Sequence, residues 1–403
     1  MIKKSPTISK PVILLIIILL LSIFFRFYKI HDFLFWGMDQ EYEAFLAKNI
    51  LSGKHFPLIG VNASDTGLYL GPAFIYFASI LFAFFSGNPL GWAITASVLG
   101  IITTYVVYVV GKSMFHQKTG LFASFLYGVS WLTSFYDRQF WNPVFVPLLS
   151  LVLGVITYGI LQGKVKKLLL FSLILGMGIQ SHLSLLIFVP IIIFALWEKR
   201  KLINKKIILL SIIIFIATQL PLIFFDLRHD FTNLKAAVNL LSSNHSNSVT
   251  NSSTIFSRNI LYISSLGRFI VPPINSDWLV ESGQCLELIG YRKDRLLAGS
   301  LILSLLTVLL FIKKNKIKKS LFQNKGYQLL GVIYIVTFIF IQMYHRQLFE
   351  YYLLYFFPWL AICFGFIASY YWEKENFRKL IITLVIILAF VNIIALLTSR
   401  YNF

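Results

Sequence analysis

Three carboxylates lie close together between Trp36 and Glu43, directly after the first long apolar segment of the chain, 11–28. They are Asp39, Glu41 and Glu43, in a chain that has only 16 acidic residues among 403. Acids beside an apolar segment lose hydration unless water, a phosphate group or a substrate compensates. A carboxylate placed there can take a proton from an attacking hydroxyl or amine, so Asp39 is the candidate general base, with Glu41 or Glu43 orienting it. The alternatives are an acidic surface loop for the whole stretch and a solvated helix face for Glu43.

Further polar residues that could bind a substrate lie at the ends of later apolar segments. Arg138 could bind a phosphate through its planar guanidinium, with Asp137 as a functional acid or as a local charge partner. Asn142 precedes Pro143 and could bind substrate or cap a helix. His182 could donate to a phosphate or to a sugar hydroxyl, or be a hydrogen-bonded structural residue. The other candidates are four cationic or imidazole side chains expected on the outer face: Arg26, Arg228, His345 and Arg346.

The elements that must position these residues are apolar. The chain is 58% hydrophobic and only 13% charged, which predicts an all-α polytopic membrane protein rather than a soluble one. Apolar segments long enough, or nearly so, to cross a core of about 30 Å predict about 11 transmembrane helices. These segments are 11–28, 67–86, 90–111, 119–136, 143–161, 168–197, 207–225, 296–312, 327–343, 352–371 and 380–398.

Basic residues determine the predicted orientation. The N-terminus and the loops 112–118, 164–167, 199–206, 313–325 and 374–379 hold 22 of the 36 Lys and Arg residues. This bias places them in the cytoplasm and explains the net charge of +20 without nucleic acid. It requires two adjustments: 168–197 turns back near Gln180-Ser181-His182, and 67–86 is a re-entrant or interfacial segment. Asp39, Asp137 and Arg138 are then expected on the outer face of a plasma-membrane protein.

The first outer loop, 31–66, is expected to carry an amphipathic helix that ends at Gly53. The pattern that indicates this helix consists of Glu41, Tyr42, Phe45, Leu46, Asn49 and Ile50, and the helix could lie along the membrane interface. We expect three regions along the chain. They are a catalytic transmembrane module over 1–230 that includes the loop 31–66, an outer loop region over 231–295, and C-terminal transmembrane helices over 296–403.

The chain has no Walker loop, Rossmann fingerprint, HExxH motif or CxxC pair, which argues against nucleotide hydrolysis, dinucleotide chemistry and structural zinc. The energy for a reaction on the outer face would therefore have to arrive with the substrate. A polyprenyl-phosphate-linked sugar meets this need, because its lipid tail fits between helices and its phosphate fits outward-facing arginines.

Four motifs follow one another along the chain. They are the Asp39 loop, Gly67-Leu-Tyr-Leu-Gly-Pro72, Arg138-x-x-x-Asn-Pro143 and Gly176-x-x-x-Gln-Ser-His182. This order resembles bacterial membrane glycosyltransferases of the GT-C fold. Examples are the dolichyl-phosphate-mannose protein mannosyltransferases (glycosyltransferase family 39), the lipid A aminoarabinose transferases and the RgtA/B/C/D-like galacturonosyltransferases. The resemblance covers roughly residues 10–230 and adds Tyr69 to the candidate substrate-binding residues.

The resemblance implies inverting transfer of a hexosyl or pentosyl group from a polyprenyl-phosphate donor to a lipid, glycan or protein of the envelope. It implies Asp39 as general base and neither cofactor nor metal. Relatives often have Asp-Glu where this chain has Asp39-Gln40-Glu41, and an Asp where it has Asn142. The partners expected are therefore membrane lipids, the donor and the acceptor, with no nucleic acid.

Two other readings compete with a transferase. A transporter or flippase for a lipid or glycan should have ionisable residues near mid-membrane and matched halves with broken helices, whereas the candidates here gather at the outer ends. A noncatalytic scaffold for envelope assembly would leave the carboxylate cluster unexplained. The effect of Asp39→Asn on sugar transfer separates the three readings.

Overall fold

The structure is a computed structural model that describes residues 9–63, 66–242, 255–272, 297–302, 304, 324–344 and 348–398. In this part of the chain the elements are helices, and the one β-bridge pairs Asn62 with Tyr69. The α-helices are α1 (Lys10–Phe27), α2 (Met38–Leu51), α3 (Ala73–Phe85), α4 (Pro89–Met114), α5 (Gln117–Val129), α6 (Trp131–Tyr136), α7 (Val146–Leu161), α8 (Leu168–Gly178), α9 (Phe188–Glu198), α10 (Lys205–Thr218), α11 (Leu220–Arg228), α12 (Thr232–Ser242), α13 (Ile255–Ile270), α17 (Lys325–Met343), α18 (Phe357–Trp372) and α19 (Glu375–Thr398).

Five of these helices are long and apolar enough to cross a membrane, and they include α1, α4 and α19. The pair α10 and α11, bent by 58°, makes a sixth candidate, and three shorter apolar helices add to the bundle. The predicted segments therefore coincide with helices, apart from 296–312, most of which lies outside the described residues. Within the described residues, several of the predicted segments are divided into shorter helices, as at Ser130 between α5 and α6.

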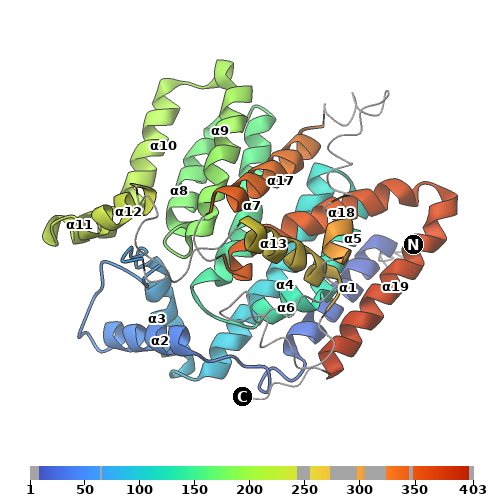
Figure 1. Ribbon diagram of the computed structural model, residues 1–403, viewed down its shortest axis with the longest axis horizontal. Coiled ribbons are helices and arrows are strands. Elements are labelled where there is room, and N and C mark those ends of the chain that lie inside the picture. The colour runs from blue at the N-terminus through green and yellow to red at the C-terminus, as the bar shows by residue number, and fades with distance from the viewer. Residues whose placement is uncertain are drawn as a thin grey trace, which may run out of the picture.

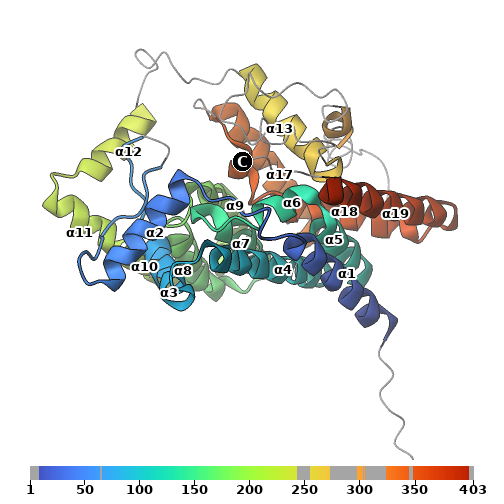
Figure 2. The same ribbon diagram turned by 90° about the horizontal axis from the view of Figure 1, so that it is seen from below.

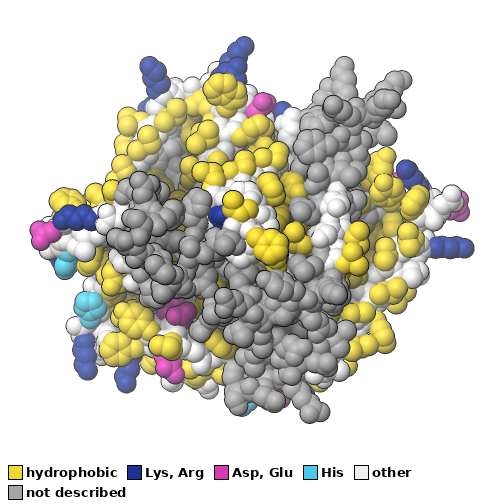
Figure 3. All heavy atoms as spheres, viewed as in Figure 1, with side chains coloured by type: hydrophobic (Ala, Val, Ile, Leu, Met, Phe, Trp, Pro, Cys, Tyr) yellow, Lys and Arg dark blue, Asp and Glu magenta, His cyan; other side chains and the backbone are white. Residues whose placement is uncertain are grey.

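The centre of the bundle is formed by α4, α5 and α18, with α1 against α4 and α5. Small residues let these backbones approach closely, as is typical of helix packing in membranes. A Cβ added at Gly365 of α18 would lie 2.6 Å from the carbonyl oxygen of Thr119 on α5. In Figures 1 and 2, α1 and α19 lie at one side of the molecule and α10 to α12 at the other. Hydrophobic side chains cover much of the face seen in Figure 3, as expected for a surface in contact with lipid.

Two predicted features of the outer segments are present as helices. The amphipathic helix of the loop 31–66 is α2, and 168–197 divides into α8 and α9 around the turn that contains Gln180 to His182. The segment 67–86 yields only α3, whose 13 residues span about 20 Å, too short to cross the bilayer core. The predicted outer loop 231–295 contains α12 and α13, so it is more helical than expected. The division into three regions stays a prediction.

Candidate functional site

The candidate base and its neighbours stand on α2. Gln40 helps to start this helix, since its side-chain oxygen accepts from the backbone N–H of Gly37 at 3.1 Å. The buried face of α2 consists of Gln40, Glu43, Ala47 and Ile50, at helical spacing. Asp39 and Glu41 are exposed in the first turn, where the helix dipole favours negative charge. The helix was predicted correctly; of the residues whose pattern predicted it, Ile50 is buried, whereas Glu41, Tyr42 and Phe45 are exposed.

The environment of Glu43 differs from the solvated helix face that one of the sequence-based alternatives gave it. Glu43 is 0% exposed rather than solvated. Its Oε1 accepts from the backbone N–H of Asn142 at 3.1 Å, and its Oε2 finds no hydrogen-bond partner among the described residues. Burial raises the pKa of the Glu43 carboxyl well above its usual value and Asp39 raises it further, against the lowering effect of the Asn142 hydrogen bond. The signal available in the sequence was the spacing of Glu43 with Ala47 and Ile50.

Asn142 joins three of the sequence motifs. Its backbone N–H is bound by Glu43 of α2, while its side-chain Nδ2 donates to the carbonyl oxygen of Ser181 at 3.0 Å. The Ser181 hydroxyl returns a hydrogen bond to the carbonyl oxygen of Asn142. The backbone N–H, the carbonyl oxygen and the side-chain Nδ2 of Asn142 thus connect segments, and its substrate-binding role stays a prediction.

The adjacent Gln180 extends this connection to the Gly67–Pro72 motif. Its side-chain oxygen accepts from the backbone N–H of Ala73 at 3.2 Å, and its Nε2 donates to the carbonyl oxygen of Thr218. A Cβ added at Gly71 would overlap the Gln180 side chain, so glycine is needed there for close approach. The motifs that resemble a family in sequence therefore meet in space.

His182 lies beside this connection. It is 9% exposed, and its Nδ1 is hydrogen-bonded to the Ser184 hydroxyl at 2.7 Å and accepts from the Ser184 backbone N–H at 3.2 Å. Its ring centroid lies 5.8 Å from that of Tyr351 and 5.5 Å from that of Tyr352. The contacts of Nδ1 fit the structural reading of His182. The two tyrosines come from the C-terminal part of the chain, which the sequence did not connect to this site.

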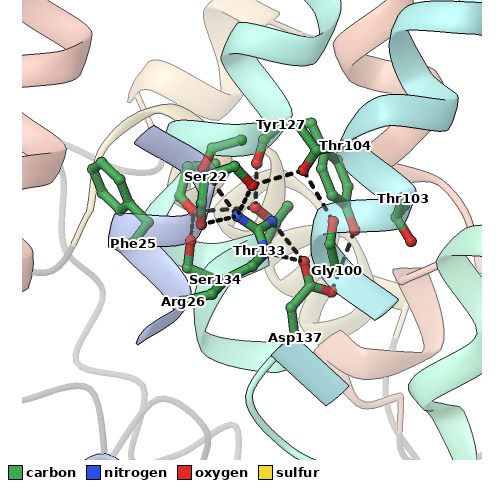
Figure 4. Close-up of polar contacts among 12 residues, drawn as sticks. Ser22, Phe25, Arg26, Gly100, Thr103, Thr104, Tyr127, Thr133, Ser134 and Asp137 are labelled. Atoms are coloured by element: carbon green, nitrogen blue, oxygen red, sulfur yellow. Dashed lines mark hydrogen bonds and ion pairs between the residues drawn. The ribbon is translucent and has the colours of Figure 1, made fainter. Parts of the chain in front are cut away.

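Arg26 has a different environment from the one predicted. It is 0% exposed and forms a buried ion pair with Asp137 (Figure 4), whose Oδ2 lies 2.6 Å from Nη2 and 3.0 Å from Nε. Its Nη1 donates to the Ser22 hydroxyl at 2.8 Å and to the carbonyl oxygen of Gly128 at 3.0 Å. These contacts occupy the guanidinium, so the predicted substrate-binding role of Arg26 does not fit this conformation. Asp137 is a charge partner, as one alternative held, but of Arg26 rather than of the adjacent Arg138.

Arg138 is also buried, with 3% exposure. Its guanidinium carbon lies 4.7 Å from the ring centroid of Phe33, in the segment directly before α2, and its Nη2 donates to the carbonyl oxygen of Phe25. Arg138 therefore lies next to the segment that leads into α2, the helix that carries Asp39. Because it is covered, it does not present an open phosphate site in this conformation. That Asp39 and Arg138 share one cavity stays a prediction.

Of the remaining candidates, those that the structure describes lie near α11 and α12. Tyr69 is half-buried, and its backbone N–H and carbonyl both bind the side chain of Asn233 on α12, at 2.6 and 3.1 Å. Asp226 accepts from the backbone N–H of Asn233 at 2.7 Å, so it fixes the start of α12. Arg228 is exposed on the last turn of α11. His345 and Arg346 lie outside the described residues.

The described residues hold no group of three or more His, Cys, Asp or Glu side chains arranged to bind a metal ion. The buried acids Asp137 and Glu350 are each bound to arginine instead. That the reaction needs no metal stays a prediction.

Comparison with known proteins supports the sequence resemblance. Residues 70–225 match the family model described as dolichyl-phosphate-mannose-protein mannosyltransferase. The fold is similar to that of ArnT from Cupriavidus metallidurans bound to undecaprenyl phosphate, with 13% identity over 89% of this chain and a TM-score of 0.58. It is also similar to the Archaeoglobus fulgidus oligosaccharyltransferase in complex with Zn and sulfate, with 14% identity over 96% of this chain and a TM-score of 0.55.

This chain spans 60% and 54% of the length of those two proteins, respectively. The comparison with curated proteins gives no match. The described residues form helices and one β-bridge, and several of these helices are long and apolar enough to cross a membrane. These observations agree with the similarities to known proteins. The chain is therefore a multi-pass membrane protein with the GT-C fold of membrane glycosyltransferases, as its ordered motifs predicted.

Proposed function

We propose that this protein is an integral membrane glycosyltransferase. It moves a hexosyl or pentosyl group from a polyprenyl-phosphate donor to a lipid, glycan or protein of the envelope, on the outer face of the plasma membrane, with the N-terminus in the cytoplasm. The observation that carries the proposal is the meeting of α2, the segment around Asn142 and the turn at Ser181 through hydrogen bonds. These are the segments whose motifs resemble lipid-dependent sugar transferases, and Asp39 stands one helical turn from Glu43, which is the α2 residue in this connection.

The proposed reaction is a single displacement. The Asp39 carboxylate takes the proton of the acceptor hydroxyl or amine, and the acceptor atom attacks the anomeric carbon of the sugar. The bond to the phosphate oxygen breaks at the same time, so polyprenyl phosphate leaves with the electron pair and the configuration at carbon inverts. The exposure of Asp39 supports this role, because an acceptor from outside the bundle can reach its carboxylate.

Binding of the donor phosphate requires cationic or hydrogen-bond donor groups. Arg228, exposed on α11, is the described candidate, since the guanidiniums of Arg26 and Arg138 are covered by the fold. Arg138 would contribute only after the Phe33 segment moved aside. Glu41, also exposed on α2, lies close enough along the helix to contribute to the field around Asp39.

The direct test uses purified protein in proteoliposomes with radiolabelled polyprenyl-phosphate sugars and envelope extract as acceptor. The proposal requires labelled acceptor together with released polyprenyl phosphate, and mass spectrometry of envelope glycans should show one modification missing from cells that lack the gene. Movement of the lipid-linked sugar across the bilayer without any labelled product would instead identify a flippase. No product and no movement with any donor would contradict both readings.

A further inference from the structure

The described part of the chain contains three buried acids whose hydrogen-bond and ion-pair partners differ. Asp137 and Glu350 are 6% and 5% exposed, and each lies 2.6 Å from an arginine nitrogen, of Arg26 and Arg268 respectively. Each also accepts from a tyrosine hydroxyl, of Tyr127 or Tyr136. Glu43 is the most deeply buried of the three, and among the described residues its carboxyl accepts one hydrogen bond, from the neutral backbone N–H of Asn142.

Among the described residues, no cationic side chain is paired with the Glu43 carboxyl, and Lys48, the cation on α2, is exposed. The same helix contributes Asp39, a like charge. The neighbouring α3 has no charged residue, and the hydroxyl of its Tyr76 donates to the carbonyl oxygen of Pro57. On α4, the apolar Trp92 and Ala96 belong to the same buried cluster as Ala47 and Ile50 of α2.

The fourth segment packed against α2 runs from residue 137 to residue 145. Its two charged residues make contacts elsewhere: Asp137 binds Arg26, and Arg138 lies over the ring of Phe33. Phe140 and Val144 of this segment are part of the apolar cluster that covers α2. An ionised carboxylate buried in such a site would lose its hydration without a compensating charge, so the protonated form is favoured.

We propose that Glu43 is a positioning residue that works as a neutral carboxylic acid, latching α2 and its Asp39 to the Asn142 segment. Its carbonyl oxygen Oε1 accepts from the Asn142 N–H, and the proton resides on Oε2. A neutral Glu43 also means that no second negative charge lies one helical turn from Asp39. The part of this inference that concerns catalysis rests on the proposed function, whereas the protonation state does not.

Glu43→Gln tests the idea because glutamine reproduces the protonated acid, with an oxygen that accepts and an NH₂ in place of the O–H. Glu41→Gln, on the exposed side of the same helix, is the matched control. Because the pKa of Glu43 in the folded protein is raised above the ordinary value of 4.5, its contribution to stability is fully present below that value and is lost as pH rises through the folded pKa. Thermal unfolding of Glu43→Gln should therefore match the wild type in acid and exceed it increasingly as pH rises.

Infrared spectroscopy gives a second readout that needs no substrate. The carbonyl stretch of a protonated carboxylic acid should be present in the wild type and in Glu41→Gln at neutral pH, and absent in Glu43→Gln. If Glu43→Gln does not fold, the same band is measured in Glu43→Asp, where a shift relative to the wild type is expected. A Glu43→Gln protein less stable than the wild type at neutral pH, or a wild type without the band, would overturn the neutral latch.

The catalytic part is tested by the pH dependence of sugar transfer. Glu43→Gln should keep near wild-type kcat at neutral pH and should lose less activity than the wild type at alkaline pH, where Glu43 ionises. Glu43→Ala should lower kcat more than it changes KM, because the latch is absent while the substrate contacts remain. Loss of transfer in a folded Glu43→Gln protein would show that a charged carboxylate is needed there.

Discussion

Asp137→Ala should be among the most destabilising single substitutions in this protein. It removes the carboxylate that lies 2.6 and 3.0 Å from two nitrogens of Arg26, a guanidinium with 0% exposure. Removing one partner of such a pair leaves a buried charge uncompensated and typically costs about 3–5 kcal/mol. That cost corresponds to roughly a 10²–10⁴-fold shift in the unfolding equilibrium. The assay is unfolding of the purified protein in one detergent at fixed pH, followed by fluorescence.

Two controls show whether the pairing is responsible. Glu373→Ala breaks the ion pair between Lys118 and Glu373, whose side chains are 46% and 63% exposed, and should leave the unfolding curve nearly unchanged. The double variant Arg26→Met with Asp137→Leu removes both buried charges and should recover most of the lost stability. If Asp137→Ala lowered the free energy of unfolding as little as Glu373→Ala, the ion pair between Arg26 of α1 and Asp137 would not contribute to stability as predicted.

Two further substitutions test close packing and the attachment of α12. Gly100→Ala would place its Cβ 2.5 Å from Oδ2 of Asp137, and overpacking of this kind should lower stability by about 1–3 kcal/mol, measured by the same unfolding assay. Asn233→Ala removes both hydrogen bonds to the backbone of Tyr69 and should cost about 1–3 kcal/mol, with faster hydrogen exchange at the Tyr69 amide. The exposed Asn239→Ala on the same helix is the control for the second variant, and equal exchange in the two would contradict the attachment.

Much of the fold was accessible from hydrophobic length and charge alone. The turn at Gln180 to His182 was predicted because one 30-residue segment had basic loops on both sides, and α8 and α9 confirm it. The helix α2 was predicted from the periodicity of the 31–66 loop. The buried face of this helix was not predicted, because acids and aromatic residues occur on more than one of its faces. The pattern alone therefore does not identify the face that packs against the bundle.

The errors at the candidate site come from contacts distant in sequence. Arg26 binds Asp137, which lies 111 residues further along the chain, and no local pattern indicates this pairing. Arg26 was expected to bind substrate on the outer face because it ends an apolar segment, a position where arginine often reaches the membrane surface. The contacts of His182 with Tyr351 and Tyr352 likewise depend on how the C-terminal helices pack.

The central claim is that the Asp39 carboxylate serves as the base for sugar transfer. The most direct measurement is the single-turnover rate of Asp39→Asn with a polyprenyl-phosphate sugar, beside Glu41→Gln as the exposed neighbour on the same helix. Loss of a general base predicts a rate about 10²–10⁴-fold lower for Asp39→Asn, with an unchanged unfolding curve and donor binding, while Glu41→Gln stays much closer to the wild type. A folded Asp39→Asn protein that transfers sugar at a near wild-type rate would contradict the claim.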